Sequence, residues 1–180
     1  EAQIPNWRKL PKKGNGFIRI IATNIGNMGA AGSEKERDVF QWMKHTEADT
    51  MIITEVGINW NKVQSAHRLQ ARCNKYLQRF VQLSSSLYDK NASQRQWGGT
   101  AIVARGNISG RWMETTNDPT RMGRWSSMRF QGKTNTTFRI ISIYIPNKLK
   151  KSAGSVYIQQ ATAMATRNRT SDPIDAMIED

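Results

Sequence analysis

Polar side chains with chemical uses follow the predicted strands of this sequence at the points where those strands end. Asn24 and Glu55 end the first two predicted strands, and Tyr144 and Asn147 follow an isoleucine-rich run. In layered folds the strand ends and their loops gather at one edge, where sites are commonly built. A carboxylate there can bind Mg²⁺, which often takes only one or two carboxylates, and Asn and Tyr can hydrogen-bond phosphate oxygens. The combination suits metal-assisted cleavage of a phosphoester, although a Glu at a strand end is usually solvated and an Asn there usually makes a turn.

The lysines beside this group favour a polyanionic partner. Lys148, Lys150 and Lys151 come directly after Asn147, and 27 Lys and Arg against 14 Asp and Glu give the chain a net charge of +13. Such a field favours nucleic acid or an anionic membrane surface, and a basic surface of no special purpose is the alternative. Near the site, the lysines would neutralise flanking phosphates.

Arginines and tryptophans supply further candidates for nucleic-acid contact. Arg124 could face nucleic acid, although solvated arginines on strand faces are commoner. Trp97, Trp112 and Trp125 could stack on bases, although tryptophans next to strands more often belong to the core. Trp60, just past Glu55, is the aromatic residue that we place near the site.

The spacing of apolar residues predicts the elements that must position these groups. Strands are predicted at residues 17–23, 48–55, 79–84, 97–105 and 138–144, and the isoleucine-rich run at 139–147 is interpreted as a buried strand. Two more strands follow the Gly-Arg-Trp triplets at Gly110 and Gly123, and we expect them to pair as antiparallel neighbours. Helices are predicted from a Ser-x-x-Glu capping box at Ser33 to about Glu47, over 63–76 and 157–165, and from Pro173 onward.

This order of elements predicts the fold class. An early β-α-β unit, then several strands with hairpin signals, then helices indicate an α+β layered sandwich. With 180 residues the chain suits one domain; we place it at 17–180, after a basic lead-in at 1–16. The chain begins at Glu1 without a methionine, and its last helix shows no stop signal, so we expect a longer protein of which this is a part.

Composition excludes several other classes. Cys73 is the only cysteine, so there is neither a disulfide framework nor a cysteine-based metal site. No apolar run approaches the ~18–20 residues of a membrane span, and the N-terminus lacks the apolar core of a signal peptide. We therefore expect an intracellular protein, in the nucleus or cytoplasm.

Four segments in order resemble the endonuclease/exonuclease/phosphatase superfamily: FIRIIATNIG, ADTMIITEV, WGGTAIVAR and FRIISIYIPN. That superfamily includes apurinic/apyrimidinic endonucleases and the endonuclease domains of non-LTR retrotransposons. The resemblance spans roughly residues 17–160, and the Tyr-x-Pro-Asn segment after the isoleucine-rich strand is its most specific part.

The resemblance implies a four-layer α/β sandwich with two facing sheets, which hydrolyses phosphoesters with Mg²⁺ or Mn²⁺. By position, Asn24 is similar to the family's first-strand Asn, which helps to organise the catalytic centre, and Glu55 to its metal-binding Glu. Tyr144 and Asn147 resemble the residues that approach the scissile phosphate. A DNA endonuclease domain of retroelement origin is therefore the leading hypothesis.

The sequence also departs from the family pattern. Thr54 and Thr23 stand where the family usually has Gln and an aromatic residue, and the later Gly-Asp-x-Asn and Ser-Asp-His motifs are absent. His45 and His67 fall on predicted helices early in the chain and do not replace the catalytic His. We therefore expect the N-terminal part of the sandwich, inactive by itself. A non-catalytic basic nucleic-acid-binding remnant, and a phosphatase or RNA-processing member of the superfamily, remain open.

Overall fold

A computed structural model describes residues 10–87, 96, 98–148, 155–167, 169 and 172–179. The elements follow the order β1 (Ile20–Asn24), α1 (Glu34–His45), β2 (Thr50–Thr54), a 3₁₀ helix (Ser65–His67), α2 (Leu69–Tyr76), β3 (Phe80–Ser85), β4 (Thr100–Arg105), a second 3₁₀ helix (Gly106–Arg111), β5 (Trp112–Asn117), β6 (Trp125–Gln131), β7 (Thr137–Ile143), α3 (Val156–Ala165) and α4 (Pro173–Glu179).

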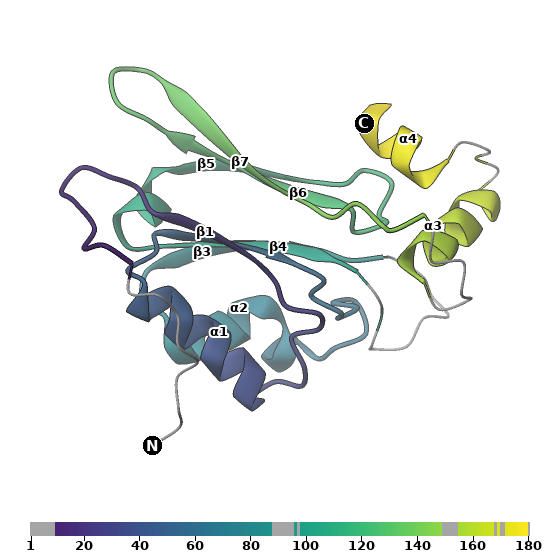
Figure 1. Cartoon of the computed structure of the whole chain (residues 1–180), viewed down its shortest axis with the longest axis horizontal. Coiled ribbons are helices and arrows are strands. Elements are labelled where there is room, and N and C mark those ends of the chain that lie inside the picture. The colour runs from purple at the N-terminus through teal and green to yellow at the C-terminus, as the bar shows by residue number, and fades with distance from the viewer. Residues whose placement is uncertain are drawn as a thin grey trace.

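Two sheets lie face to face as layers (Figure 1). The first sheet has the order β1-β2-β4-β3, in which β1 pairs parallel with β2 and the other pairs are antiparallel. The second has the order β5-β6-β7 and is antiparallel throughout. The strands after the two Gly-Arg-Trp triplets are therefore neighbours, as the sequence predicted.

Helices α1 and α2 cover the outer face of the first sheet (Figure 1). The N-cap at Ser33 is confirmed, because Glu36 N donates to Ser33 Oγ at 3.3 Å. The Glu36 carboxylate accepts from Gly32 N at 3.2 Å, one residue before the N–H that a capping box uses. Because successive strand residues point to opposite faces, one side of each central strand packs beneath these helices. The core there consists of apolar side chains that include Phe40, Met43, Met51, Ile53, Leu69 and Val103.

The space between the sheets is apolar at one end and polar at the other. Ile102, Met128, Phe130 and Ile140 form the buried apolar cluster. Toward the C-terminal ends of β1 and β2, buried hydroxyls take over: Thr100 Oγ1 and Ser126 Oγ lie 2.8 Å apart, and Ser142 Oγ donates to Ile53 O at 3.2 Å. The sheets are thus joined by hydrogen bonds at the edge where the polar strand-end residues lie.

The isoleucine-rich run is not buried as predicted. In β7 Phe138, Ile140 and Ser142 point into the space between the sheets, whereas Ile141, Ile143 and the following Ile145 are exposed. An antiparallel edge strand has two different faces, and the sequence did not show which one the described chain covers. Trp112 is likewise 46% exposed and does not belong to the core.

The fold class is confirmed as α+β, with two facing sheets and helices outside them. Element bounds differ from the prediction where local chemistry intervenes. β4 begins at Thr100 because Gly98 and Gly99, with φ of +80° and +86°, interrupt the extended chain. The helix predicted at 63–76 is divided into the 3₁₀ turn at Ser65–His67 and α2 from Leu69, with Arg68 extended between them. The division into a lead-in and a domain stays a prediction.

No helix in the described part of the chain combines the length and apolarity that a membrane span requires.

Candidate active site

Glu55 lies directly after β2 in a left-handed backbone conformation, with φ +54°. That region is uncommon for a residue with a side chain. The conformation is held by the loop that leaves β1, because Ile25 N donates to Thr54 O at 3.1 Å and Asn27 N donates to Glu55 O at 2.7 Å. The side chain is half-buried. A carboxylate is thus fixed at the end of a central strand of the first sheet.

Asn24 ends β1 opposite Thr54, so its loop adjoins Glu55. Asn24 Oδ1 accepts from Gly26 N at 3.0 Å, which makes a local turn. A Cβ built on Gly26 would lie 3.9 Å from Glu55 Oε2, which shows how closely this loop passes the carboxylate. The structure therefore brings Asn24 and Glu55 together, with the Asn24 amide in a turn.

Tyr144 comes to Glu55 from the other sheet. It follows β7, its N–H donates to Arg124 O at 2.8 Å, and its hydroxyl lies near enough to the Glu55 carboxylate for that group to raise its pKa. Its ring packs beside Gly98, where an added Cβ would lie 3.6 Å from the ring carbons. Burial, the hydrogen bond to Glu55 and the negative charge of Glu55 raise the pKa of Tyr144 to about 12. The hydroxyl therefore stays protonated at neutral pH.

Asn147 and Lys148 are exposed beyond this pair. Lys148 Nζ lies 2.7 Å from Asp172 Oδ2, and the hydroxyl of Tyr157 donates to the same oxygen at 2.6 Å. These bonds, with one from Ile174 N, lower the pKa of Asp172 to about 2. Lys148 thus already has a carboxylate partner, on the segment before α4. Lys150 and Lys151 lie outside the described residues, as does Trp97.

The prediction that Arg124 contacts nucleic acid is wrong. Its side chain is fully buried. Arg124 Nε donates to Asp118 Oδ2 at 3.0 Å, and Nη1 donates to Pro173 O at 3.0 Å. Burial alone would raise the pKa of Asp118, but hydrogen bonds from Arg124 and Thr120 outweigh it and hold that pKa below its usual value. Arg124 is a structural cation that connects the start of β6 to α4.

The prediction that Trp60 contacts nucleic acid is also wrong. It is 8% exposed and belongs to the core beneath α1 and α2, with the Arg72 guanidinium 5.6 Å from its ring centroid. A base cannot stack on a face that the protein core already occupies. Only a small edge of Trp60 borders a surface cavity.

A magnesium site here would depend on few protein ligands. No group of three His, Cys, Asp or Glu residues that could hold a metal occurs in the part of the chain that the structure describes. Glu55, beside the Asn24 loop and the Tyr144 hydroxyl, offers one carboxylate in an oxygen-rich setting. Mg²⁺ accepts such a set because it keeps several waters and commonly binds through one or two carboxylates plus substrate phosphates. The donor set fits, with Glu55 as its only anionic member among these residues.

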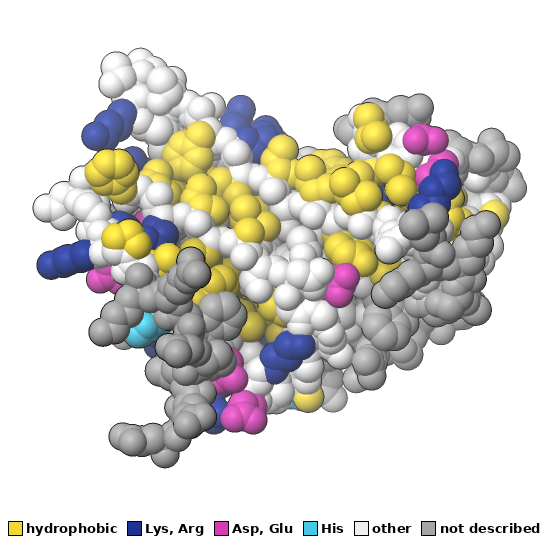
Figure 2. Space-filling model, viewed as in Figure 1, with side chains coloured by type: hydrophobic (Ala, Val, Ile, Leu, Met, Phe, Trp, Pro, Cys, Tyr) yellow, Lys and Arg dark blue, Asp and Glu magenta, His cyan; other side chains and the backbone are white. Residues whose placement is uncertain are grey.

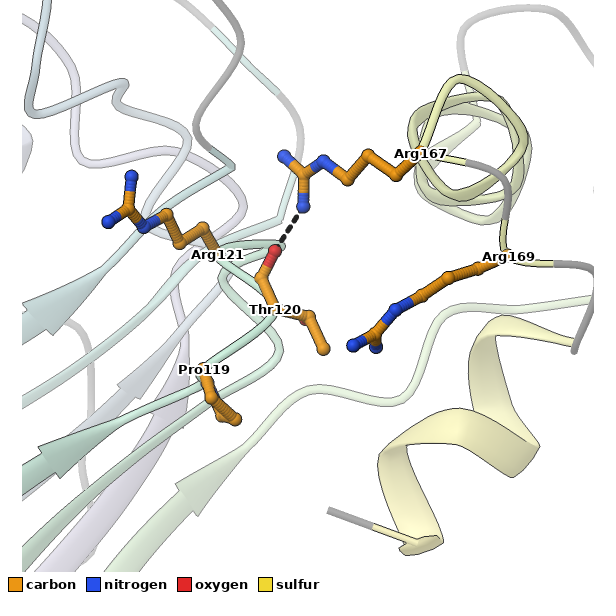
Figure 3. A pocket seen from close by; sticks show the side chains of 5 residues that line it. All are labelled: Pro119, Thr120, Arg121, Arg167 and Arg169. Carbon is orange, nitrogen blue, oxygen red and sulfur yellow. Dashed lines mark hydrogen bonds between the residues drawn. The ribbon is translucent and has the colours of Figure 1, made fainter.

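The structure gathers arginines that sequence reasoning missed. Arg121, Arg167 and Arg169 line one cavity with Pro119 and Thr120 (Figure 3). Arg121 is distant from the other two in the sequence, so no local pattern could show the cluster. The net charge of +13 indicated a basic surface, but it did not indicate which residues lie together on that surface.

No family model matches the sequence, and no curated protein matches it. The structure is similar to an AP endonuclease from Leishmania major, at a TM-score of 0.54 and 12% identity, over 89% of this chain and 47% of that chain. It is also similar to an endonuclease/exonuclease/phosphatase protein from Beutenbergia cavernae DSM 12333, at a TM-score of 0.49 and 11% identity, over 83% and 42% of the two chains. An AP endonuclease from Archaeoglobus fulgidus gives a TM-score of 0.47 and 14% identity, over 72% and 42%.

The chain spans less than half the length of each of these three proteins. At such low identity the likeness concerns the fold, and the catalytic roles of Asn24, Glu55, Tyr144 and Asn147 stay predictions. The described chain has a two-sheet α/β sandwich fold similar to that of the Leishmania major AP endonuclease, over about half of that protein's length.

Proposed function

We propose that Asn24, Glu55, Tyr144 and Asn147 belong to a Mg²⁺- or Mn²⁺-dependent phosphodiesterase site that acts on nucleic acid, with DNA as the expected substrate. The observation that carries the proposal is that the Tyr144 hydroxyl lies near the Glu55 carboxylate, at the ends of strands from two different sheets. The four sequence segments resemble the superfamily that includes retrotransposon endonuclease domains, and a retroelement origin is part of the proposal.

The residues have separable roles in this proposal. Glu55 would hold the metal ion, and the ion would neutralise charge that develops on the phosphate. Tyr144, whose hydroxyl is protonated at neutral pH, would serve as a hydrogen-bond donor to a phosphate oxygen. The Asn24 turn keeps the loop after β1 against Glu55, and the exposed Asn147 would supply an amide donor beside Tyr144.

We also propose that these 180 residues do not cleave nucleic acid by themselves. Hydrolysis also needs a group that orients the attacking water, and such groups act as a unit with the metal. The family's Gly-Asp-x-Asn and Ser-Asp-His motifs, which would supply that group, do not occur in the sequence.

The second candidate is a basic nucleic-acid-binding protein without catalysis. The net charge of +13 and the single carboxylate at the candidate site favour it. It differs from the first candidate in one respect that can be measured directly, because it has no need to bind a metal at Glu55.

Metal binding decides between the two. We expect Mn²⁺ titrated by electron paramagnetic resonance to bind the wild-type chain and to bind Glu55→Gln at least ~10-fold more weakly, since the amide lacks the anionic oxygen that hard cations prefer. Glu34→Gln is the matched control, because Glu34 is an exposed carboxylate in the first turn of α1. Equal Mn²⁺ affinity of wild type and Glu55→Gln would exclude the metal role of Glu55.

The same preparations are then incubated with supercoiled plasmid and Mg²⁺ or Mn²⁺. We expect no nicking by the 180-residue chain. Nicking that disappears in Tyr144→Phe would show that the chain is catalytically complete, against the proposal.

A further inference from the structure

The cavity lined by Arg121, Arg167 and Arg169 has a volume of about 390 Å³ and, apart from these arginines, is lined by Pro119 and Thr120 (Figure 3). Among the described residues that line it, none carries a carboxylate. Like charges gathered around one cavity repel one another, and an anion in the cavity removes that repulsion.

The loop that carries Arg121 is fixed from beneath. Buried Asp118 accepts from Thr120 N at 2.9 Å and from Arg124 N and Nε at 3.0 Å, and Arg121 N donates to Asp118 O at 3.0 Å. Gly123, with φ +71°, packs so closely on Ser86 that a Cβ would lie 2.7 Å from Ser86 Cα. Asp118 and Arg124 are therefore positioning residues for this loop.

The segment that carries the other two arginines is fixed independently. Arg167 N and Arg169 N both donate to Met164 O, at 2.9 and 3.0 Å, and Met164 is buried against Leu87, Met122 and Ala176. The Arg167 guanidinium donates to Thr120 O, which ties the end of α3 to the loop (dashed line in Figure 3). The backbones of the three arginines are thus held by buried contacts, while their side chains are exposed.

Stabilisation of a helix end does not account for the whole group. Arg167 and Arg169 follow the C-terminus of α3, where cations favour the helix dipole. Arg121 belongs to a different segment, between β5 and β6. Guanidinium groups from two segments, with a buried frame under each, are the arrangement that recognises phosphate oxygens through several charge-assisted hydrogen bonds.

A second cavity of about 280 Å³ adjoins the first through Arg121. Asn61, Ser84, Ser86 and Asn117 are among the residues that line it, and so is Asp118, whose buried carboxylate is paired with Arg124. In Figure 3 the Arg121 side chain extends away from Arg167 and Arg169. Two neighbouring cavities with cationic, amide and hydroxyl groups suit successive phosphates on one chain better than a single free phosphate, because such groups make most backbone contacts to nucleic acid.

We propose that these adjoining cavities bind neighbouring phosphates of a nucleic-acid backbone, with Arg167 and Arg169 at one phosphate and Arg121 at the next. The proposal rests on the proposed function only in taking nucleic acid as the polyanion. It uses none of the residues assigned to the candidate active site.

The test measures binding of a fluorescently labelled DNA duplex by anisotropy, with EDTA present, between 50 and 200 mM salt. For Arg167→Ala/Arg169→Ala we expect the log–log salt slope to fall by about 0.9 for each phosphate that the protein no longer neutralises, and the affinity at 0.1 M salt to fall at least ~5-fold. Circular dichroism spectra and melting temperatures identify any variant that fails to fold, and Arg121→Ala then tests the second cavity separately.

The matched control is Arg111→Ala/Lys133→Ala. This variant also removes two positive charges, at exposed positions at the opposite end of the second sheet. Arg111 lies next to Trp112, and Lys133 lies in the turn between β6 and β7. We expect its salt slope to remain that of the wild type. Equal slopes for both double variants, or no change in either, would overturn the proposal.

Inorganic phosphate separates the two sources of the ligand. If phosphate binds in a manner that depends on Arg167 and Arg169 while the wild type binds no duplex or single strand, the assignment to nucleic acid is wrong. Metal is absent from this assay, so failure of the Glu55 metal test leaves its result intact. Conversely, a salt slope that stays unchanged when the arginines are replaced would not alter the result of the Mn²⁺-binding test of Glu55.

Discussion

The two sheets differ in what covers their outer faces. α1 and α2 pack on the first sheet and enclose the largest apolar cluster of the described chain. A buried ion pair lies within this layer, where Arg72 Nη1 donates to Glu36 Oε2 at 2.7 Å. Arg72 also donates to His67 O and Gly29 O, which satisfies donors that burial would otherwise leave unpaired.

The outer face of the second sheet is exposed over β7. Glu114 pairs there with Arg129 at 2.9 Å and with Arg139 at 2.6 Å, and all three side chains are more than a third exposed. Ile141 and Ile143 follow on the same face, 45% and 49% exposed. Exposed apolar residues also lie just before β1 and at its first position, and β1 is an edge strand of the other sheet. Figure 2 shows hydrophobic side chains gathered over both sheets.

This difference separates stability from recognition in the molecule. The covered sheet supplies the packed core that holds the end of β2 and therefore Glu55. The exposed sheet brings Tyr144 to Glu55 across polar contacts, and its β5–β6 loop carries Arg121 of the arginine cavity. Changes in the first sheet should therefore mainly affect stability, and changes in the second sheet should mainly affect recognition and association.

The largest effect is expected from the buried ion pair. Arg72→Ala leaves the Glu36 carboxylate buried without its cation and should lower the free energy of unfolding by ~3–5 kcal/mol. Arg139→Ala removes an exposed pair and should cost about 0–1 kcal/mol. Urea denaturation of both variants at pH 7 compares them, and similar losses would show that the two layers do not differ as described.

Much of the fold was predictable because it depends on local patterns. β-branched runs identified β1, β2, β4 and β7, and the capping box at Ser33 identified the start of α1. Turn signals correctly paired β5 with β6. Periodicity did not show which face of β7 is covered, because burial of an edge strand depends on what packs against it.

The candidate site was predictable in part for the same reason. The sequence placed Asn24, Glu55 and Tyr144 at strand ends, and topology brings strand ends to one edge. Arg124 and Trp60 failed because an arginine or a tryptophan has the same local signal whether buried or exposed. Burial of Arg124 depends on Asp118 and Pro173 O, and no short-range pattern indicates the latter contact.

The exposed face of β7 should govern self-association. Ile141→Lys/Ile143→Lys places charges on an apolar edge strand, which natural proteins use to prevent edge-to-edge pairing. We expect the variant to bind less of a hydrophobic dye and to elute as a smaller species in size-exclusion chromatography coupled to light scattering. Folding should be retained, because both side chains point away from the space between the sheets.

Thr137→Lys is the control for this experiment. Thr137 is exposed on the same strand and on the same face, but at its polar end. An equal decrease in association for this control would mean that added charge alone prevents association, and that the exposed isoleucines are not responsible.

The smallest predicted effect concerns the contact between Tyr144 and Glu55, which lie at the ends of strands from the two sheets. Burial is the largest cause of the raised pKa of Tyr144, and Glu55 adds to it by its hydrogen bond and charge. Because the folded-state pKa lies above the ordinary value of about 10, this tyrosine stabilises the fold below pH 10, and that contribution is lost as the pH rises toward 12.

In Glu55→Gln the pKa of Tyr144 should decrease but stay above its ordinary value, since burial remains. Carbon-13 NMR of labelled tyrosine rings measures this, with Tyr144→Phe to assign the signal and Tyr157 as an internal reference whose partner is Asp172. A Tyr144 titration that is identical in wild type and Glu55→Gln would mean that the two sheets are not bridged at this point in solution.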